Sequence, residues 1–385
     1  MNTYEFNDRQ FDIKTTRSWF IYSKENHIDP IQIYRVDTQH FEIRDIDNNI
    51  LFELNYKDIH QDIRFQYAKH AYLDETLLFF IAARSSDGIH SYLYLVNPLK
   101  EQSFHRLDLN RDIKGIVTNI FVSSALKNES RNDYHIVTLG TLDSAIYVFR
   151  ITAEMMTEKQ PLACALLRSD ARNSITQQLI VLDTQSKSPA DVYMMCGGSN
   201  GIIDFFLVKA DCKVENEPII DFVSHQLGKL PSNLPIVSIQ CHKINDREVL
   251  LAISQELFNP NRISRSTEPS VSMLKFNTKK LVGKNITSMK FQRGTHIISG
   301  DIMTKECFQT RACYFDPDNG LLMMTQFEFD VNRFEFGEKT DTFLQGIPQD
   351  LQQVAVLDKN TSWVLGKQAL QKLKLAKGLK RKQST

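Results

Sequence analysis

One pattern occurs twice within residues 134–208, and this repetition decides the fold. The first copy is His135-Ile-Val-Thr-Leu-Gly140-Thr-Leu-Asp143-Ser144-Ala-Ile-Tyr-Val-Phe149, and the second is Val192-Tyr-Met-Met-Cys-Gly197-Gly-Ser-Asn200-Gly201-Ile-Ile-Asp-Phe-Phe206. Gly140 matches Gly197 and Phe149 matches Phe206, each pair 57 positions apart. Each copy is an apolar run, a tight turn and a second apolar run, which predicts a β-hairpin. The Asn200-Gly201 pair supplies the positive φ angles that a two-residue hairpin turn needs.

The hairpin pattern recurs along the chain. An Asp87-Gly88 turn lies 56 positions before Asp143, and an Asn319-Gly320 turn lies 119 positions after Asn200. Seven hairpins are predicted in all, centred near residues 26, 87, 143, 200, 260, 319 and 360. A period of roughly 40–60 residues with about four strands per unit is typical of β-propeller blades. We therefore predict an all-β chain that forms a single seven-bladed β-propeller.

The predicted propeller occupies residues 1–365, and residues 366–385 form a short basic C-terminal helix or tail. The last unit is short of one or more strands, and the N-terminal segment at residues 4–13 is available to complete it. Closure by both ends of the chain would remove exposed edge strands, which are prone to aggregate.

The two best units resemble WD40-type repeats. The pattern Gly-x-x-Asp/Asn-Gly/Ser-x-Ile-x-x-Phe stands where that family has Gly-x-x-Asp-Gly-x-Val-x-x-Trp. No unit ends in Trp-Asp and none opens with Gly-His, so the chain resembles a degenerate member whose blades depend on apolar packing. The resemblance implies a scaffold that binds other proteins through its rims and loops. The order of features is also similar to that of the kaptin family, propeller subunits of a nutrient-signalling complex.

Charge and cysteine content exclude some classes of protein. Lys plus Arg and Asp plus Glu each total 46, so the net charge is zero, which argues against a generally basic nucleic-acid binder. The six Cys form no C-x-x-C pair, as is typical of free thiols in a reducing compartment. The polar N-terminus predicts no signal peptide, and no apolar run approaches the ~20 residues of a membrane span. We expect an intracellular protein, with the nucleus favoured over the cytoplasm.

Three motifs resemble catalytic or metal sites. Gly197-Gly-Ser199-Asn-Gly201 fits the G-x-S-x-G elbow of hydrolases, but that elbow needs a helix after the serine and a strand pattern follows here. Asp316-Pro-Asp318-Asn-Gly320 is similar to the start of a calcium loop, but no further carboxylate follows before Glu328. The sequences Cys241-His242 and Cys307…Cys313 lack the paired spacing of a structural zinc site.

We therefore predict no catalytic residue, no cofactor, no metal and no enzymatic activity. The predicted function is a non-catalytic WD40-like interaction scaffold within a multiprotein complex. Two alternatives remain open. The first is a kaptin-like subunit of a cytoplasmic signalling complex. The second is a propeller enzyme or ligand binder that uses the central channel.

A polar insert at residues 255–269 takes the place of a tight turn, so we expect it to project from one rim. It places two serines beside two arginines, which is typical of a partner-binding or phosphorylation loop. The predicted partner-binding residues are Arg262, Ser264, Arg265 and Ser266. The alternative is a tolerated surface insertion.

The C-terminal tail is the most strongly charged segment, with no acidic residue and with leucines at approximately helical spacing. Its predicted partner-binding residues are Lys367, Lys372, Lys374, Lys377, Lys380, Arg381 and Lys382. Three interpretations remain open: a nuclear-import or nucleic-acid patch, an amphipathic helix that docks on a partner or an anionic membrane, and a solvated extension.

Overall fold

The computed structural model describes most of the chain, and every structural statement below concerns this part. The described residues are 17–23, 30–59, 62–73, 75–99, 104–123, 126–127, 133–152, 162–168, 175–182, 191–209, 219–224, 230, 233–245, 247–255, 268–277, 280, 282–291, 302–303, 307–316, 321–344, 351–356, 361–366 and 370–374.

Seven antiparallel sheets make up the described structure, numbered here in chain order. Sheet 1 contains β1 (Arg17–Tyr22), β2 (Pro30–Val36), β3 (His40–Asp45) and β4 (Ile50–Asn55). Sheet 2 contains β5 (Ile63–Leu73), β6 (Thr76–Ser85), β7 (His90–Val96), β8 (Phe104–Arg106) and the short β9 (Ile113–Lys114). Sheet 3 contains β10 (Val117–Val122), the short β11 (Leu126–Lys127), β12 (Asp133–Thr141), β13 (Ala145–Ile151) and β14 (Cys164–Arg168). The one described helix, α2 (Tyr56–Ile59), lies between β4 and β5.

The other four sheets have the same order of neighbours. Sheet 4 contains β15 (Ile175–Leu182), β16 (Asp191–Gly198), β17 (Ile203–Lys209) and β18 (Ile219–Ser224), and sheet 5 contains β19 (Ile236–Asn245), β20 (Glu248–Gln255), β21 (Ser270–Asn277) and β22 (Val282–Lys290). Sheet 6 contains β23 (Ile302–Met303), β24 (Cys307–Asp316), β25 (Leu321–Asp330) and β26 (Glu335–Leu344). Sheet 7 contains β27 (Leu351–Val356), β28 (Thr361–Gly366) and β29 (Leu370–Lys374). All seven predicted hairpins are present, the last with only one further described strand beside it.

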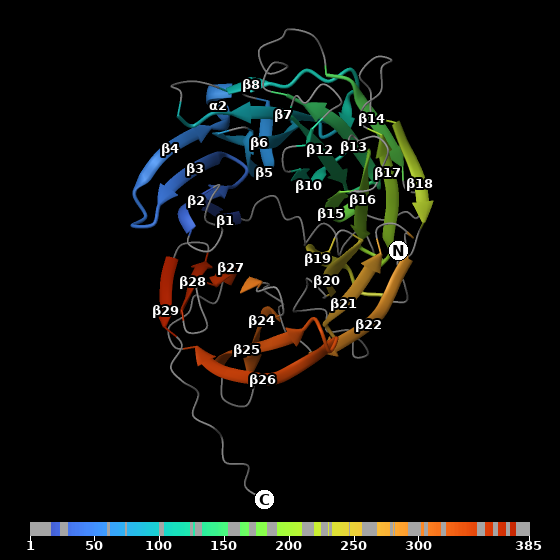
Figure 1. Cartoon of the computed structure of the whole chain (residues 1–385). Coiled ribbons are helices and arrows are strands. Elements are labelled where there is room, and N and C mark those ends of the chain that lie inside the picture. Colours follow the sequence, from blue (N-terminus) through green and yellow to red (C-terminus); the bar gives the residue numbers. More distant parts are fainter. Residues whose placement is uncertain are drawn as a thin grey trace, which may run out of the picture.

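The sheets follow one another around a common centre (Figure 1). The first strand of each sheet lies towards the centre and the last strand lies at the periphery. Sheet 1 meets sheet 7, because β1 contacts both β27 and β28. At this junction Leu365 packs with Phe20 and Ile33, and all three side chains are buried. The ring is therefore closed, and the predicted β-propeller is confirmed.

Each sheet is apolar on both faces, which is why the sheets stack radially. Along β13, Tyr147 and Phe149 pack in the cluster between sheets 2 and 3, whereas Ile146 and Val148 pack in the cluster between sheets 3 and 4. Side chains alternate between the two faces of a strand. Burying each such side chain contributes about 1.5–3 kcal/mol. A sheet of this composition needs a neighbour on each side.

The hairpin turns differ from the predicted two-residue turn. In the second copy, the Gly201 N–H donates to the Gly198 oxygen at 3.2 Å, and the Gly198 N–H donates to the Ile202 oxygen at 2.9 Å. Only Gly201 has a positive φ, 78°, so the loop has three residues and its last residue is left-handed. This geometry matches the twist of the strands with one positive φ instead of two. The equivalent residues Gly88 and Ser144 have φ values of 74° and 69°.

Polar groups reinforce the turn of the first copy, although the Trp-Asp and Gly-His residues of WD40 repeats are missing. The Thr141 hydroxyl lies 2.6 Å from Oδ1 of Asp143 and accepts the Ala145 N–H at 3.0 Å. The Tyr147 hydroxyl accepts the N–H of Lys114 at 2.9 Å. Apolar packing is thus not the only interaction that holds this blade.

The prediction of a C-terminal helix directly after residue 365 is wrong for part of the tail. Residues 370–374 form the strand β29, in which Leu370 pairs with Leu365 and Lys372 pairs with Trp363. Pairing satisfies the backbone groups along the edge of β28, which a helix would leave open. Residues 4–13 and 375–385 lie outside the described residues, so the fourth strand of sheet 7 and a separate tail stay predictions.

Candidate functional site

The four predicted residues of the insert, Arg262, Ser264, Arg265 and Ser266, lie outside the described residues. Both ends of the insert are described and are held by buried hydrogen bonds. The fully buried Gln255 ends β20 and donates from Nε2 to the Leu234 oxygen at 3.1 Å. The Pro269 oxygen accepts the N–H of Phe291 at 2.8 Å. The two described ends of the insert are therefore fixed at the end of β20 and directly before β21.

The predicted tail residues are divided between a strand and the undescribed part of the chain. Lys372 and Lys374 belong to β29, where they pair with Trp363 and Thr361 of β28. The other five, Lys367, Lys377, Lys380, Arg381 and Lys382, lie outside the described residues. The described part of the tail, residues 370–374, is thus part of sheet 7.

The described residues of the motifs that resemble catalytic or metal sites belong to hairpins of the sheets. A strand, β17, follows Ser199, so the G-x-S-x-G sequence is a hairpin as predicted. The calcium-like sequence begins at Asp316, the last residue of β24, and β25 begins directly after Gly320. Within the described residues, no group of three or more His, Cys, Asp or Glu is placed to hold a metal ion.

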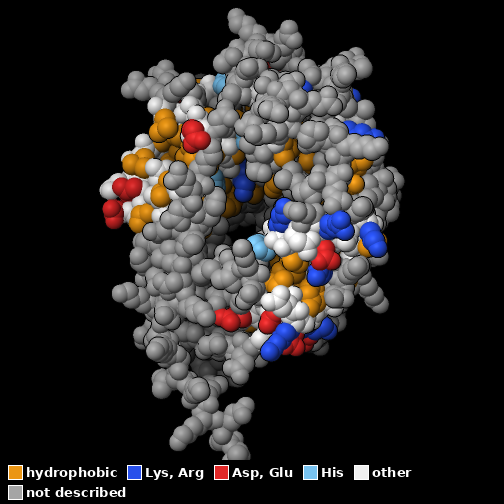
Figure 2. Space-filling model, in the orientation of Figure 1, with side chains coloured by type: hydrophobic (Ala, Val, Ile, Leu, Met, Phe, Trp, Pro, Cys, Tyr) orange, Lys and Arg blue, Asp and Glu red, His pale blue; other side chains and the backbone are white. Residues whose placement is uncertain are grey.

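The innermost strands border an open central channel. In sheet 5, every residue of β20 after Glu248 is buried, whereas most residues of the neighbouring β19 are partly or fully exposed. Sheet 2 shows the same contrast between β6 and β5. Figure 2 shows a hollow at the centre of the ring, with Lys or Arg and His side chains around it. The sequence analysis named the central channel as an alternative site but none of its residues, because these come from separate sheets.

The channel wall has an unusual charge composition. The innermost strands β1, β5, β10, β15, β19, β23 and β27 contain no Asp or Glu in their described residues. The Lys, Arg and His residues on these strands are Arg17, Arg64, Lys69, His70, His242 and Lys243. Of these, Arg64 makes a cation–π contact outside the channel wall, since its guanidinium lies 4.3 Å from the ring centroid of Tyr56.

Lys69 and His70 are adjacent on β5 and differ in their surroundings. Lys69 is partly buried, and its side chain has no hydrogen bond or ion pair with any described residue. Burial lowers the pKa of its ammonium group. The His70 ring lies edge-on to Tyr34, with 5.4 Å between centroids. Burial, and secondarily the charge of Lys69, lower the pKa of His70 to about 3. His70 is therefore neutral at pH 7 and a poor proton donor.

On the opposite side of the ring, β19 presents Cys241 and His242. Burial raises the pKa of the Cys241 thiol to about 12, so the sulfur stays protonated and is a weak nucleophile. Burial also lowers the pKa of His242. The described channel wall offers no carboxylate to orient an imidazole, which is the arrangement that general-base and nucleophilic sites use. These groups suit binding better than acid–base catalysis.

An aromatic group completes one side of the wall. Trp19 of β1 stacks on Tyr34 with 5.0 Å between centroids and meets Tyr67 of β5 edge-on at 5.5 Å. Trp19 and Tyr67 are both partly exposed. Sheets 1 and 2 thus place an aromatic surface at Tyr67, two residues before Lys69 on β5.

No family model matches the chain, and no curated protein matches its sequence. Solved structures share the general arrangement. The WD40 domain of SCAP from fission yeast is 7% identical, with 94% of this chain and 81% of that chain covered and a TM-score of 0.47. Semaphorin 2a from Drosophila is 8% identical, with 94% and 74% covered and a TM-score of 0.49. A post-proline cleaving enzyme from Rickettsia typhi is 10% identical, with 97% and 55% covered and a TM-score of 0.45.

These likenesses are too distant to support an argument about function, and the propeller assignment above depends on the closed ring itself. Among the described residues, no helix is long and apolar enough to cross a membrane.

Proposed function

We propose that the protein is a non-catalytic interaction scaffold and a subunit of a multiprotein complex. One observation carries the proposal: the outermost strand of sheet 1 exposes two large apolar side chains at an open edge. Ile50 and Leu51 of β4 are 51% and 52% exposed. In the described structure β4 pairs only with β3, so one row of its backbone groups is available to another chain.

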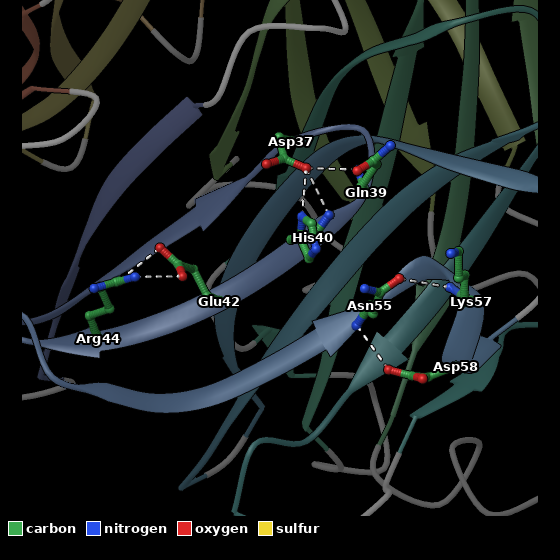
Figure 3. A network of polar contacts seen from close by, with 8 residues as sticks. All are labelled: Asp37, Gln39, His40, Glu42, Arg44, Asn55, Lys57 and Asp58. Carbon is green, nitrogen blue, oxygen red and sulfur yellow. Dashed lines mark hydrogen bonds and ion pairs between the residues drawn. The ribbon is translucent and has the colours of Figure 1, made fainter.

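Acidic side chains surround this apolar edge. Asp47, Glu53 and Asp58 are exposed next to β4. Figure 2 shows hydrophobic and acidic side chains together on this part of the ring. The nearest arginine is neutralised, because Arg44 makes two hydrogen bonds to Glu42, of 2.8 and 2.9 Å (Figure 3). The chemistry fits a partner segment that is basic and apolar and that adds a strand to β4.

Local hydrogen bonds hold this edge in a fixed shape. Asp37 accepts the N–H groups of Gln39 and His40, both at 2.7 Å, in the turn between β2 and β3. After β4, Asp58 accepts the N–H of Asn55 at 3.1 Å, as Figure 3 also shows. A rigid edge binds without the entropy cost of ordering a loop.

Affinity purification from cells tests the scaffold proposal. The double variant Ile50→Ser/Leu51→Ser is expected to lose partners that the unaltered protein retains. The matched control is Val282→Ser/Ile286→Ser, since these residues are 44% and 38% exposed on β22, the outermost strand of sheet 5. Equal recovery of all partners by both variants contradicts the proposal.

The tail is proposed as a second contact, with an acidic protein surface or nucleic acid, in the nucleus. The test is a chain that ends at Lys374, because this truncation keeps β29 paired. Loss of salt-sensitive partners from that chain supports the tail contact. Unchanged recovery assigns the binding to the ring and leaves the tail as a solvated extension.

A kaptin-like subunit of a cytoplasmic signalling complex is the second candidate. Its support is the order of the two hairpins around Asp143 and Asn200 before a basic C-terminal segment. Strand β29 weakens this support, because the resemblance implies a helical C-terminal tail and residues 370–374 of that tail form a strand instead. Co-purification of the same partners in cytoplasmic but not nuclear extracts favours this candidate.

A further inference from the structure

We infer that the central channel binds a small anionic ligand, and that Lys69 anchors the carboxylate or phosphate group of this ligand. The inference does not depend on the scaffold proposal, because the channel and the β4 edge belong to opposite ends of the sheets, the innermost and the outermost strand.

The first argument is the absence of competing acids. A lysine that lines an interior surface is usually neutralised by a nearby Asp or Glu, because an unpaired charge in a partly desolvated site is unfavourable. The described residues of all seven innermost strands contain no carboxylate. The described residues of these strands therefore supply no carboxylate to pair with the Lys69 ammonium group, and an anion from outside would supply that counter-charge.

The second argument is the environment of the ammonium group itself. Lys69 is partly buried on β5, where its backbone pairs with Phe80, and no described residue hydrogen-bonds or ion-pairs with its ammonium group. Its strand neighbours Ala68 and His70 supply no negative charge, and His70 is neutral near pH 7. A bound carboxylate or phosphate would supply a charge-assisted hydrogen bond, which is about twice as strong as one between neutral groups.

The third argument is the position of further donors. Sheet 5 lies across the ring from sheet 2 (Figure 1). Every sheet begins with its innermost strand, so these strands run in the same direction through the channel. Lys69 lies four residues before the end of β5 at Leu73, and His242 lies three residues before the end of β19 at Asn245. Both residues thus belong to the second half of their strands.

The fourth argument is the aromatic side of the wall. Trp19 and Tyr67 meet at 5.5 Å and are partly exposed beside the strand that carries Lys69. Binding sites for small molecules combine an apolar or aromatic surface with a few polar anchors. The wall therefore offers a surface for the body of the ligand and a cation for its acidic group.

Isothermal titration calorimetry on the full chain tests the inference, with inorganic phosphate, tripolyphosphate and citrate as separate probes. We expect at least one of them to bind, and we expect Lys69→Met to weaken that binding by about 10- to 100-fold, since a hydrogen bond to a charged group is lost. Lys69→Arg should retain most of the affinity. The phosphate probes and citrate distinguish a phosphate ligand from a carboxylate ligand.

The matched control is Lys280→Met, which removes an equal charge from an exposed residue outside the innermost strands. The inference is overturned if no probe binds the unaltered protein, or if the Lys69 and Lys280 variants bind equally well. A second measurement covers the case in which Lys69→Met does not fold. The chain has two tryptophans, Trp19 and Trp363, so in a Trp363→Phe background the fluorescence reports on Trp19 alone. Saturable quenching by the same probe supports the channel site, and unchanged fluorescence contradicts it.

Discussion

The hydroxyl of Tyr72 donates a hydrogen bond of 2.8 Å to the main-chain oxygen of Tyr22 and so joins β5 of sheet 2 to β1 of sheet 1. These two innermost strands belong to different sheets and share no backbone ladder. Tyr72→Phe is expected to lower the free energy of unfolding by about 1 kcal/mol, the usual value for one net hydrogen bond. Urea denaturation measures the change. The control Tyr92→Phe should stay within about 0.5 kcal/mol of the unaltered protein.

Leu365 closes the ring. It is fully buried against Phe20 and Ile33, which come from the opposite end of the chain. Leu365→Ala should lower the free energy of unfolding by about 2–5 kcal/mol, through lost burial and a cavity. Leu99, which is 80% exposed, provides the control, since Leu99→Ala should change stability by less than about 0.5 kcal/mol. Equal effects of the two variants would show that the first and last sheets do not depend on each other.

Gly201 is required by its turn. Its φ is 78°, and a Cβ atom there would lie 2.8 Å from the Leu234 oxygen. Gly201→Ala is therefore expected to destabilise the fold by about 1–3 kcal/mol. Gly337→Ala is the control, because no positive φ is found there and the nearest atom to an added Cβ lies at 3.4 Å. Thermal unfolding of the two variants gives the comparison, and an unchanged Tm for Gly201→Ala would contradict the argument.

His70 makes stability depend on pH. Burial lowers its pKa in the folded protein to about 3, from the ordinary value of 6.5. Below pH 6.5 the unfolded chain binds a proton that the folded protein does not, so stability falls as pH is lowered from 6.5 towards 3. The slope from this one residue is at most about 1.4 kcal/mol per pH unit.

The window between pH 6.5 and 5 separates the titration of histidines from that of carboxylates, most of which are still ionised there, and substitution of His70 then gives its own share. His70→Gln should flatten the dependence of the unfolding free energy on pH within that window. His242→Gln gives a reference, since the pKa of His242 is also lowered by burial but its ring is less enclosed. A slope that does not change in His70→Gln would show that His70 titrates normally in the folded protein.

Sheet 7 has three described strands, and its outermost strand is β29. The four-stranded sheets end with an outermost strand that leads to the innermost strand of the next sheet. By this order, a fourth strand for sheet 7 would directly precede β1, where residues 4–13 lie in the sequence. We expect deletion of residues 1–13 to lower the Tm and to speed the amide hydrogen exchange of residues 370–374. Unchanged exchange in the shortened chain would contradict this closure.

Local chemistry was sufficient to predict the hairpins. A turn such as Asn200-Gly201 between two apolar runs specifies a hairpin without any help from distant residues, because one left-handed residue and the alternation of side chains are both local properties. The regular spacing of such hairpins then predicted the propeller, since a strand that is apolar on both faces, such as β13, must be covered on both sides.

Long-range pairing explains where prediction was wrong. The leucines at 370, 373, 375 and 379 have approximately helical spacing, yet residues 370–374 form a strand because β28 offers them an edge. Two positive φ angles were expected in each turn, and one is found, because the twist of the assembled sheet selects the three-residue loop.

The sequence by itself determined the class of the fold, its period and the places of its turns, because these follow from the alternation of apolar residues and from the backbone freedom of single residues. Only the tertiary structure decided which strands border the same channel. Lys69 and His242 belong to strands more than a hundred residues apart in the sequence, and neither has a local motif around it. They lie along one channel because seven sheets close around a common centre, and that closure is a property of the packed molecule.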